Sequence, residues 1–96
     1  MQYNFEWDPE KARLNRKKHG VSFEQGAVVF GDPRALSLYD GAHSMTEDRW
    51  ITLGIAAAGT LLVVHHTFTE IDPSTVTIRI FSCCKATKNE ISHYGD

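Results

Sequence analysis

The stretch IRIFSCCKAT, from Ile78 to Thr87, decides the fold, because it joins a strong strand signal to the start of a new segment. Successive residues of a strand point to opposite faces of a sheet. Ile78 and Ile80 therefore share one face, and Arg79 lies on the other. The sequence predicts a strand with one buried face and one face that presents a cation. The segment after it opens with a second cation, Lys85.

The segments before this strand show the same period of two, which is typical of a sheet. Apolar residues alternate with other residues in two short runs, 36–38 and 51–55. Residues 61–64 are continuously apolar, as in a central strand that is covered on both faces. A turn at residues 72–74 leads into the last strand. Consecutive strands of this kind predict an antiparallel arrangement.

The N-terminal part predicts one further strand and a helix. Residues 3–7 alternate between apolar and polar, which favours a strand. Asp8 and Pro9 form a strong helix start, because aspartate caps free N–H groups and proline suits the first helical position. Gly20 is expected to end this helix, directly after several basic residues that favour a helix C-terminus.

A second helix starts at Ser22, with Gln25 three residues later as a capping box, and ends at residues 31–33. A short C-terminal helix is expected to carry three residues on one side: Thr87, Ile91 and Tyr94. The predicted order is β-α-α-β-β-β-β-α. This order favours an α+β fold, an antiparallel sheet with helices packed on one face.

Composition and charge limit the class of protein. The chain has 96 residues, 42% of them hydrophobic and 23% charged, which suits a single globular domain over residues 1–96. A formal net charge of −2 argues against binding nucleic acid through bulk charge alone. Half of the ten Lys and Arg residues nevertheless fall in one window: Lys11, Arg13, Arg16, Lys17 and Lys18. This basic helix suits RNA or an acidic protein partner equally well, and it also suits a merely solvated helix.

Neither export nor metal binding is expected. The N-terminus has no charged segment followed by an apolar run, and no apolar run is long enough to span a bilayer. The expected compartment is the cytoplasm, where the adjacent Cys83 and Cys84 stay reduced and point to opposite faces of a strand. There is no C-x-x-C, H-x-x-x-H or Gly-rich phosphate loop, so no metal ion or cofactor is expected.

Several residues suit RNA cleavage without a metal ion. That reaction needs a base for the 2′-hydroxyl, cations for the phosphorane, and an acid for the departing 5′-oxygen. Arg79 and Lys85 are suitable cations, and the ordinary pKa of His66 suits proton transfer near neutrality. Tyr94 can stack on a base or donate a proton. Taken singly, each is more often structural, and Arg79 can pair with the carboxylates of the turn before it.

The strand pattern limits which of these residues can act together. His65 and His66 are neighbours on a strand, so they point to opposite faces and at most one of them lies with Arg79. Arg49 shares its face with Ile51. The pattern leaves open whether this is also the face of Arg79.

Five blocks in order resemble the BrnT toxins, which are bacterial toxin–antitoxin ribonucleases of RelE-like fold. The blocks are FEWDPEKA (5–12), KHGVSFE with VFGDP (18–33), EDRWITLGI (47–55), LLVVHHT (61–67) and the closing stretch (78–87), which resembles RIISARKAT. Carried over by position, the resemblance implies Arg49, His66, Arg79 and Lys85 as site residues.

The resemblance also implies partners. A BrnT toxin inhibits translation by cleaving RNA and is neutralised by a BrnA-like antitoxin with a ribbon-helix-helix DNA-binding domain. The implied assembly is a heterotetramer through a dimeric antitoxin. It contacts operator DNA only through the antitoxin, and in this way represses its own operon.

The closing stretch departs from the family pattern at Cys84, where the family has arginine. A thiol cannot hold a phosphate bidentately, and loss of one donor from such a site typically costs on the order of 10² to 10³ in rate. Three hypotheses follow. The chain is a weakened but functional ribonuclease, or a silent member that binds the antitoxin as a co-repressor, or a protein that binds RNA without cleaving it.

Overall fold

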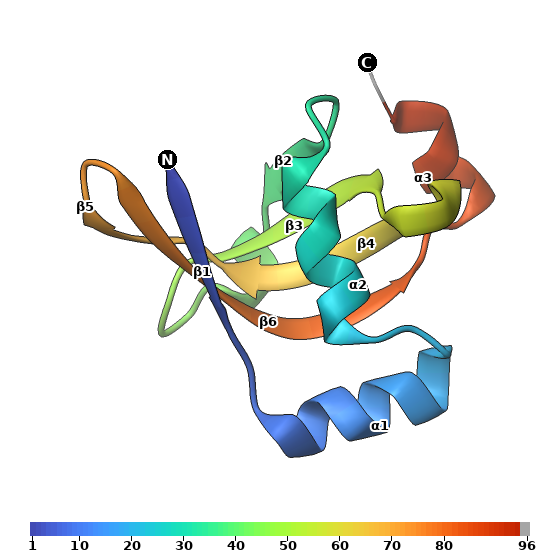
Figure 1. Ribbon diagram of the computed structural model, residues 1–96, viewed down its shortest axis with the longest axis horizontal. Coiled ribbons are helices and arrows are strands. Elements are labelled where there is room, and N and C mark those ends of the chain that lie inside the picture. Colours follow the sequence, from blue (N-terminus) through green and yellow to red (C-terminus); the bar gives the residue numbers. More distant parts are fainter. Residues whose placement is uncertain (95–96) are drawn as a thin grey trace.

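The structure, a computed structural model, describes residues 1–94 of the chain, apart from the side chain of residue 58. These residues form a mixed α+β domain in which a helical pair precedes a run of consecutive strands and a short helix follows them (Figure 1), which confirms the predicted fold class. In chain order the elements are β1 (Gln2–Glu6), α1 (Pro9–His19), α2 (Phe23–Val28), β2 (Leu36–Tyr39), β3 (Arg49–Ile55), β4 (Leu61–Thr67), β5 (Thr69–Asp72), β6 (Thr75–Lys85) and α3 (Lys88–His93). Short 3-10 turns lie at Val29–Gly31, Gly41–His43 and Ala57–Gly59.

The sheet has six strands and differs from the prediction in two respects. The strand order is β1-β6-β4-β3-β2, and β5 pairs with β6 outside this path. The strands β2, β3, β4 and β6 are antiparallel as predicted, but β1 runs parallel to β6. The expectation of a wholly antiparallel sheet is wrong at this edge, because a period of two says nothing about strand direction. The sequence gives no sign of β5, because every residue of that strand is exposed and no buried face alternates with an exposed one.

The helix ends confirm the predicted caps. The side chain of Asp8 accepts a backbone N–H at the start of α1, and Gly20 ends this helix with a φ of 71°. Such a positive φ favours glycine, which has no Cβ to clash. Ser22 and Gln25 form a reciprocal capping box on α2, and Thr87 opens α3 with a capping box of its own.

The core lies between the sheet and the first two helices (Figure 1). Its buried members include Val21, Phe23, Val29, Leu62, Val64, Val76, Ile78, Ile80 and Cys83. We call the other side of the sheet the open face. The expectation of helices on one face holds for α1 and α2, whereas α3 differs. Its Glu90 and His93 line a groove with open-face residues: Leu36, Leu38, Ile51, Leu53 and Val63. No helix within residues 1–94 is long and apolar enough to cross a membrane.

A β-bulge changes the direction of side chains in β6. The pairing of β4 with β6 shifts by one residue after His65, and Phe81 is the extra residue. Phe81 and Ser82 are therefore both directed away from the core, and Cys83 returns to it, where it is fully buried. Bulges commonly occur beside active sites, because they re-aim side chains that a regular strand would separate. In this chain the bulge places two consecutive residues on the open face.

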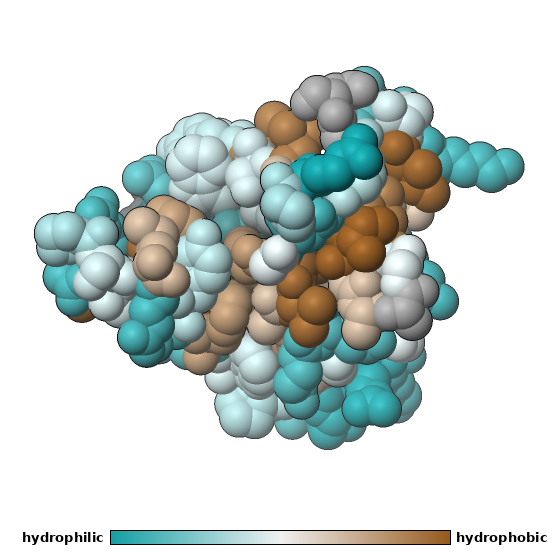
Figure 2. All heavy atoms as spheres, turned by 45° about the horizontal axis from the view of Figure 1, so that its top comes forward, coloured by the Kyte–Doolittle hydropathy of each residue, from teal (hydrophilic) through white to brown (hydrophobic). Residues whose placement is uncertain are grey.

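Apolar side chains also reach the surface. Figure 2 shows a band of hydrophobic side chains through the middle of the side that carries α2, bordered by hydrophilic ones. On that side Val28 is 48% exposed. Beside the open face, Leu38 is 58% exposed and Ile91 52%. Exposed apolar groups gathered in this way commonly mark interaction surfaces.

Candidate functional site

Arg49 lies at the start of β3 and stacks on an aromatic ring of the open face. Its guanidinium carbon is 4.2 Å from the centroid of the Phe81 ring, and the Nζ of Lys11 is 5.5 Å from the same centroid. The Nε atom of Arg49 is buried, and no hydrogen-bond partner for it lies within the described residues. One terminal nitrogen is 3.4 Å from the carboxylate of Glu47. The ring thus holds two cations, and the guanidinium of one of them keeps a buried N–H group without a hydrogen-bond partner among the described residues.

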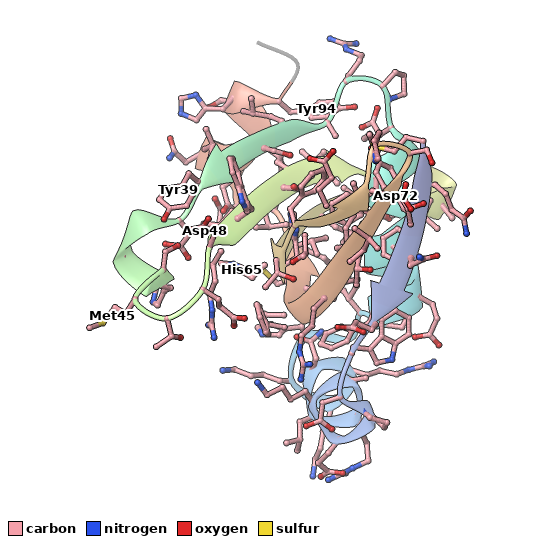
Figure 3. All side chains as sticks on the ribbon, turned by 90° about the vertical axis from the view of Figure 1, so that its left-hand side faces the viewer. Tyr39, Met45, Asp48, His65, Asp72 and Tyr94 are labelled. Carbon is pink, nitrogen blue, oxygen red and sulfur yellow. The ribbon has the colours of Figure 1, made fainter. Side chains whose placement is uncertain are left out.

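A hollow of about 270 Å³ surrounds this guanidinium. We call it the Arg49 hollow, and it is lined by Asp40, His43, Arg49, His65, Phe81 and Ser82. Four parts of the chain supply these side chains: the loop after β2, the strand β3, the strand β4 and the bulge of β6. Figure 3 shows Met45 and Asp48 on the loop, with His65 on the sheet beside it. Cation, imidazoles and aromatic ring in one hollow suit a phosphodiester with an adjoining base.

A second hollow of about 270 Å³ lies on the other side of Phe81 and reaches α1. Asn15 holds this helix in place. Its amide donates to the carbonyl oxygens of Val21 and Cys83 at 3.0 and 2.8 Å, and its oxygen accepts the N–H of Cys83 at 3.1 Å. These bonds tie α1 to the bulged strand and bring Lys11 and Lys18 to the edge of the hollow. The helix pattern gave no sign of this role for Asn15, although it is the single amide side chain within residues 9–19.

Arg79 lies on the same side of β6 as Phe81, two residues away, and its side chain is exposed. Its backbone N–H donates to the hydroxyl of Thr67 at 3.2 Å, and Thr67 pairs with Arg49 across β3 and β4. The expectation that Arg79 faces away from the core is confirmed. The structure therefore brings Arg49, Arg79 and Lys11 to one corner of the sheet. Ile51 is on the same face, which resolves the question of parity that the sequence left open.

His66, in contrast, points into the opposite side of the sheet and is 1% exposed. Its Nδ1 donates to the carbonyl oxygen of Thr67 at 2.8 Å, so its Nε2 accepts from the hydroxyl of Thr52 at 2.6 Å. The Phe30 ring meets it edge-on at 4.7 Å between centroids. Burial lowers the pKa of His66 and favours the neutral imidazole. The structure does not bring His66 together with the three cations.

His65 takes the position in the hollow that the sequence analysis considered for its neighbour. Partial burial is the main influence on His65 and lowers its pKa, and the nearby Asp40 carboxylate opposes this effect. A neutral imidazole near physiological pH is suited to accept a proton. The sequence pattern allowed at most one of the two histidines to lie with Arg79, and the expectation that this one is His66 is wrong. The pairing of His66 with the buried Ile80 decides the matter, and the continuously apolar residues 61–64 give no sign of it.

Lys85 and Cys84 lie at the far end of the sheet. Through Leu62 and Gly54, the register places Lys85 five residues along the strand direction from Arg49, roughly 17 Å. Cys84 lies four residues away, or about 13 Å, by the same reckoning through Val63 and Leu53. Burial is the main cause that raises the pKa of the Cys84 thiol. Neither residue lines the Arg49 hollow.

Tyr94 does not line the Arg49 hollow, and Figure 3 shows it on another part of the molecule than His65. Its hydroxyl donates a short hydrogen bond to the carboxylate of Asp32, and this bond raises the pKa of Tyr94. Asp32 also accepts the N–H of Ile55, so this contact ties the end of α3 to β3. Arg34 stacks on the Tyr94 ring at 5.7 Å.

The remaining basic residues of α1 are exposed: Arg13, Arg16, Lys17 and Lys18. Arg13 is engaged by Glu10, at 2.5 Å, and this pairing lowers the pKa of Glu10. The exposed basic face predicted for this helix is therefore present, with one of its charges neutralised locally. As for a metal ion, nowhere in residues 1–94 do three His, Cys, Asp or Glu side chains gather closely enough to hold one.

Comparisons with known proteins agree with this architecture. The crystal structure of the Brucella abortus ribonuclease toxin BrnT is similar, with a TM-score of 0.58 and 18% sequence identity over 92% of this chain and 100% of that one. At this identity the likeness shows a shared fold. No curated protein matches the chain by sequence. The family described as the ribonuclease toxin BrnT of type II toxin–antitoxin systems matches residues 7–90. The chain belongs to this family of BrnT ribonuclease toxins.

Proposed function

We propose that the chain cleaves RNA at the Arg49 hollow without a metal ion, and so inhibits translation in the cytoplasm. The observation that carries the proposal is the Arg49 guanidinium, stacked on Phe81 with its Nε unpartnered among the described side chains and with His65 in the same hollow. Preorganised donors of this kind stabilise the charge that develops on a phosphorane. The Phe81 ring provides a surface for a nucleobase beside the reacting phosphate.

The reaction balances with groups on this face. His65 takes the proton of the 2′-hydroxyl, and the 2′-oxygen attacks the phosphorus. Arg49 stabilises the phosphorane, with Arg79 and Lys11 beside it. The bond to the 5′-oxygen then breaks, and that oxygen leaves with a proton. The products are a 2′,3′-cyclic phosphate and a 5′-hydroxyl, and no oxidant or metal ion takes part.

Lys85 contributes differently in this proposal. Its separation of roughly 17 Å from Arg49 suits a phosphate further along the same RNA strand better than the scissile one. Cys84 is likewise separated from Arg49, by about 13 Å. The cysteine therefore weakens RNA binding along the strand but leaves the Arg49 hollow unaltered. This favours the functional ribonuclease over the silent family member.

The proposed partner is a BrnA-like antitoxin with a ribbon-helix-helix domain, joined to the toxin in a heterotetramer. A type II antitoxin is a protein, and the exposed apolar groups beside the open face suit such a partner. In this assembly the antitoxin alone contacts operator DNA. The alternative function is that of an antitoxin-binding co-repressor without ribonuclease activity, and it keeps the same partner.

The test is cleavage of a labelled RNA, in the presence of EDTA, by the purified chain and by matched variants. Arg49→Ala is expected to lower the rate by about 10² to 10³, as for loss of one preorganised donor. Arg34→Ala, which removes an exposed arginine stacked on Tyr94, is the control and is expected to retain the native rate. Lys85→Ala is expected to raise KM more than it lowers kcat, because it removes binding away from the reacting phosphate.

The variant Cys84→Arg separates the two functions. If native chain and variant both cleave, the ribonuclease assignment stands. If only Cys84→Arg cleaves, the native chain is silent and the co-repressor becomes the better account. Full retention of activity in Arg49→Ala would overturn the proposed site. Growth arrest on induction of the native chain without antitoxin would exclude the silent alternative.

A further inference from the structure

The loop between β2 and β3 holds a second imidazole beside the Arg49 hollow. The Nδ1 of His43 is 2.9 Å from a carboxylate oxygen of Asp40. The Asp40 side chain is 11% exposed, whereas that of His43 is 69% exposed. Because a carboxylate only accepts hydrogen bonds, Nδ1 carries a proton and Nε2 is directed away from Asp40. A recessed carboxylate thus orients an accessible imidazole.

The backbone fixes this pair against Arg49. The N–H of Asp40 donates to the carbonyl oxygen of Arg49 at 2.8 Å. The hydroxyl of Ser44 donates to the carbonyl oxygen of Asp40 at 2.6 Å and accepts the N–H of Arg49 at 2.9 Å. At the base of the loop, the Tyr39 hydroxyl donates to the carboxylate of Asp48 at 3.0 Å (Figure 3). The loop is therefore a fixed wall of the hollow, and Asp40 and His43 both line it together with His65.

We infer that Asp40 and His43 form a catalytic dyad, in which His43 donates the proton that the departing 5′-oxygen takes. This inference rests on the proposed ribonuclease function, which assigns the base to His65 and leaves the acid unnamed. In the step, the bond from phosphorus to the 5′-oxygen breaks, and the proton on Nε2 of His43 moves to that oxygen. Asp40 is the positioning residue, because it acts through His43 by fixing the tautomer and compensating the charge of the imidazolium.

The two histidines differ in a way that matches these roles. His65 is half-buried, and its burial favours the neutral form that a base requires. His43 is exposed, and its Nδ1 is bonded to the recessed carboxylate of Asp40, which holds the imidazole in a fixed orientation. One half-buried and one exposed imidazole beside the same cation suit the two halves of an acid–base pair. Arg49 lies between β4 and the loop, where the phosphate would meet both imidazoles.

The test uses the leaving group, because an acid is needed only when the leaving group is a poor one. Cleavage of RNA is compared with cleavage of nucleoside 3′-(4-nitrophenyl) phosphates of all four bases, whose nitrophenolate departs without a proton. His43→Ala is expected to lower kcat/KM on RNA by about 10² to 10³, and on the nitrophenyl substrates by less than about tenfold. His65→Ala and Arg49→Ala are expected to lose activity on both substrates. Arg34→Ala, which removes an exposed arginine away from the hollow, is the control and is expected to keep native activity on both substrates.

Asp40→Asn tests the positioning role. This variant is expected to lose about tenfold or more of its activity on RNA and none on the nitrophenyl substrates. In the His43→Ala background the same substitution is expected to cause no further loss, because both changes act through one proton transfer. A purely structural role for Asp40 would lower both activities and would add to the effect of His43→Ala.

Three outcomes overturn the inference. If His43→Ala cleaves RNA at the native rate, the dyad is ruled out, and the proposed site at Arg49 is unaffected. Equal losses on both substrates exclude His43 as the acid. If Arg49→Ala and His65→Ala keep native activity as well, the proposed site itself is wrong, and the dyad falls with it. Melting curves of each variant show whether a loss reflects unfolding.

Discussion

Two adjacent histidines show, at the scale of the residue, how surroundings decide a role. His65 faces the Arg49 hollow, whereas His66 is buried at the end of a hydrogen-bond chain that runs through Thr52 to the hydroxyl of Ser37. The same imidazole is therefore a candidate base at one position and a structural group at the next. His66 is expected to make the stability of the fold depend on pH, because the core accepts only its neutral form.

We expect His66→Ala to lower the free energy of unfolding by roughly 2–4 kcal/mol, because it leaves a cavity and removes the partner of Thr52. Urea denaturation measures this change. The folded fraction of the variant is expected to cleave RNA within about tenfold of the native rate, because His66 does not reach the hollow. A catalytic role for His66 would instead show as a large loss of activity in a chain of native stability.

The sign of the pH dependence follows from burial. In the folded chain the pKa of His66 lies below its ordinary value of 6.5. Between the folded and the ordinary pKa, the unfolded chain therefore binds more protons than the folded chain. Its contribution to stability is complete above about pH 6.5 and is lost as the pH falls, at up to about 1.4 kcal/mol per unit. His65 adds to the same trend. The free energy of unfolding, measured with urea between pH 5 and 8, is expected to depend less steeply on pH in His66→Gln than in the native chain. An equally steep pH dependence in this variant would contradict this account.

At the scale of the element, β3 illustrates why one position of a strand has to be glycine. A Cβ on Gly54 would lie 2.7 Å from a methyl group of Val29 and 3.2 Å from the Cβ of Ala35. The 3-10 turn after α2 rests directly on this strand because no side chain intervenes. The glycine of the EDRWITLGI block therefore sets the distance between the helical layer and the sheet.

We expect Gly54→Ala to destabilise the chain by about 1–3 kcal/mol through overpacking. Gly31→Ala is the matched control, since a Cβ at that position meets no atom within 4 Å, and its effect is expected to stay within about 0.5 kcal/mol. Thermal unfolding of both variants measures the difference. Equal melting temperatures would show that the helical layer moves away at little cost.

The helix ends could be predicted from sequence because a cap such as Ser22 with Gln25 is a local device. Which face of β3 is covered could not be predicted. Thr52 and Gly54 lie on the covered face because neighbouring elements pack on them, although neither residue is strongly hydrophobic. The bulge at Phe81 depends on how two strands meet, and a single strand carries no sign of it. The sequence therefore placed Arg79 on the face away from the core and left the face of Arg49 open. It could not distinguish His65 from His66, because the continuously apolar residues 61–64 do not show which face of β4 is covered.

At the scale of the whole molecule, the sheet separates stability from function. The covered side holds the core and His66, and the open face carries the Arg49 hollow and the groove beside α3. A net charge of −2 hides this asymmetry, because Lys11 from α1 joins two arginines of the sheet at one corner. RNA affinity should therefore depend on a few cations rather than on the charge of the chain.

That expectation fixes the salt dependence of binding. If Lys11, Arg49, Arg79 and Lys85 neutralise four phosphates of a single strand, log K falls with log salt at a slope of about −3, close to 0.7 per phosphate. Lys11→Ala is expected to reduce the magnitude of the slope by about 0.7, whereas Lys88→Ala, an exposed lysine on α3, leaves it unchanged. A DNA oligonucleotide, which lacks the 2′-hydroxyl and so cannot be cleaved, serves as the ligand in fluorescence anisotropy between 50 and 200 mM salt. A slope that responds to Lys88→Ala and not to Lys11→Ala would move the nucleic acid from the Arg49 corner to the other end of the sheet.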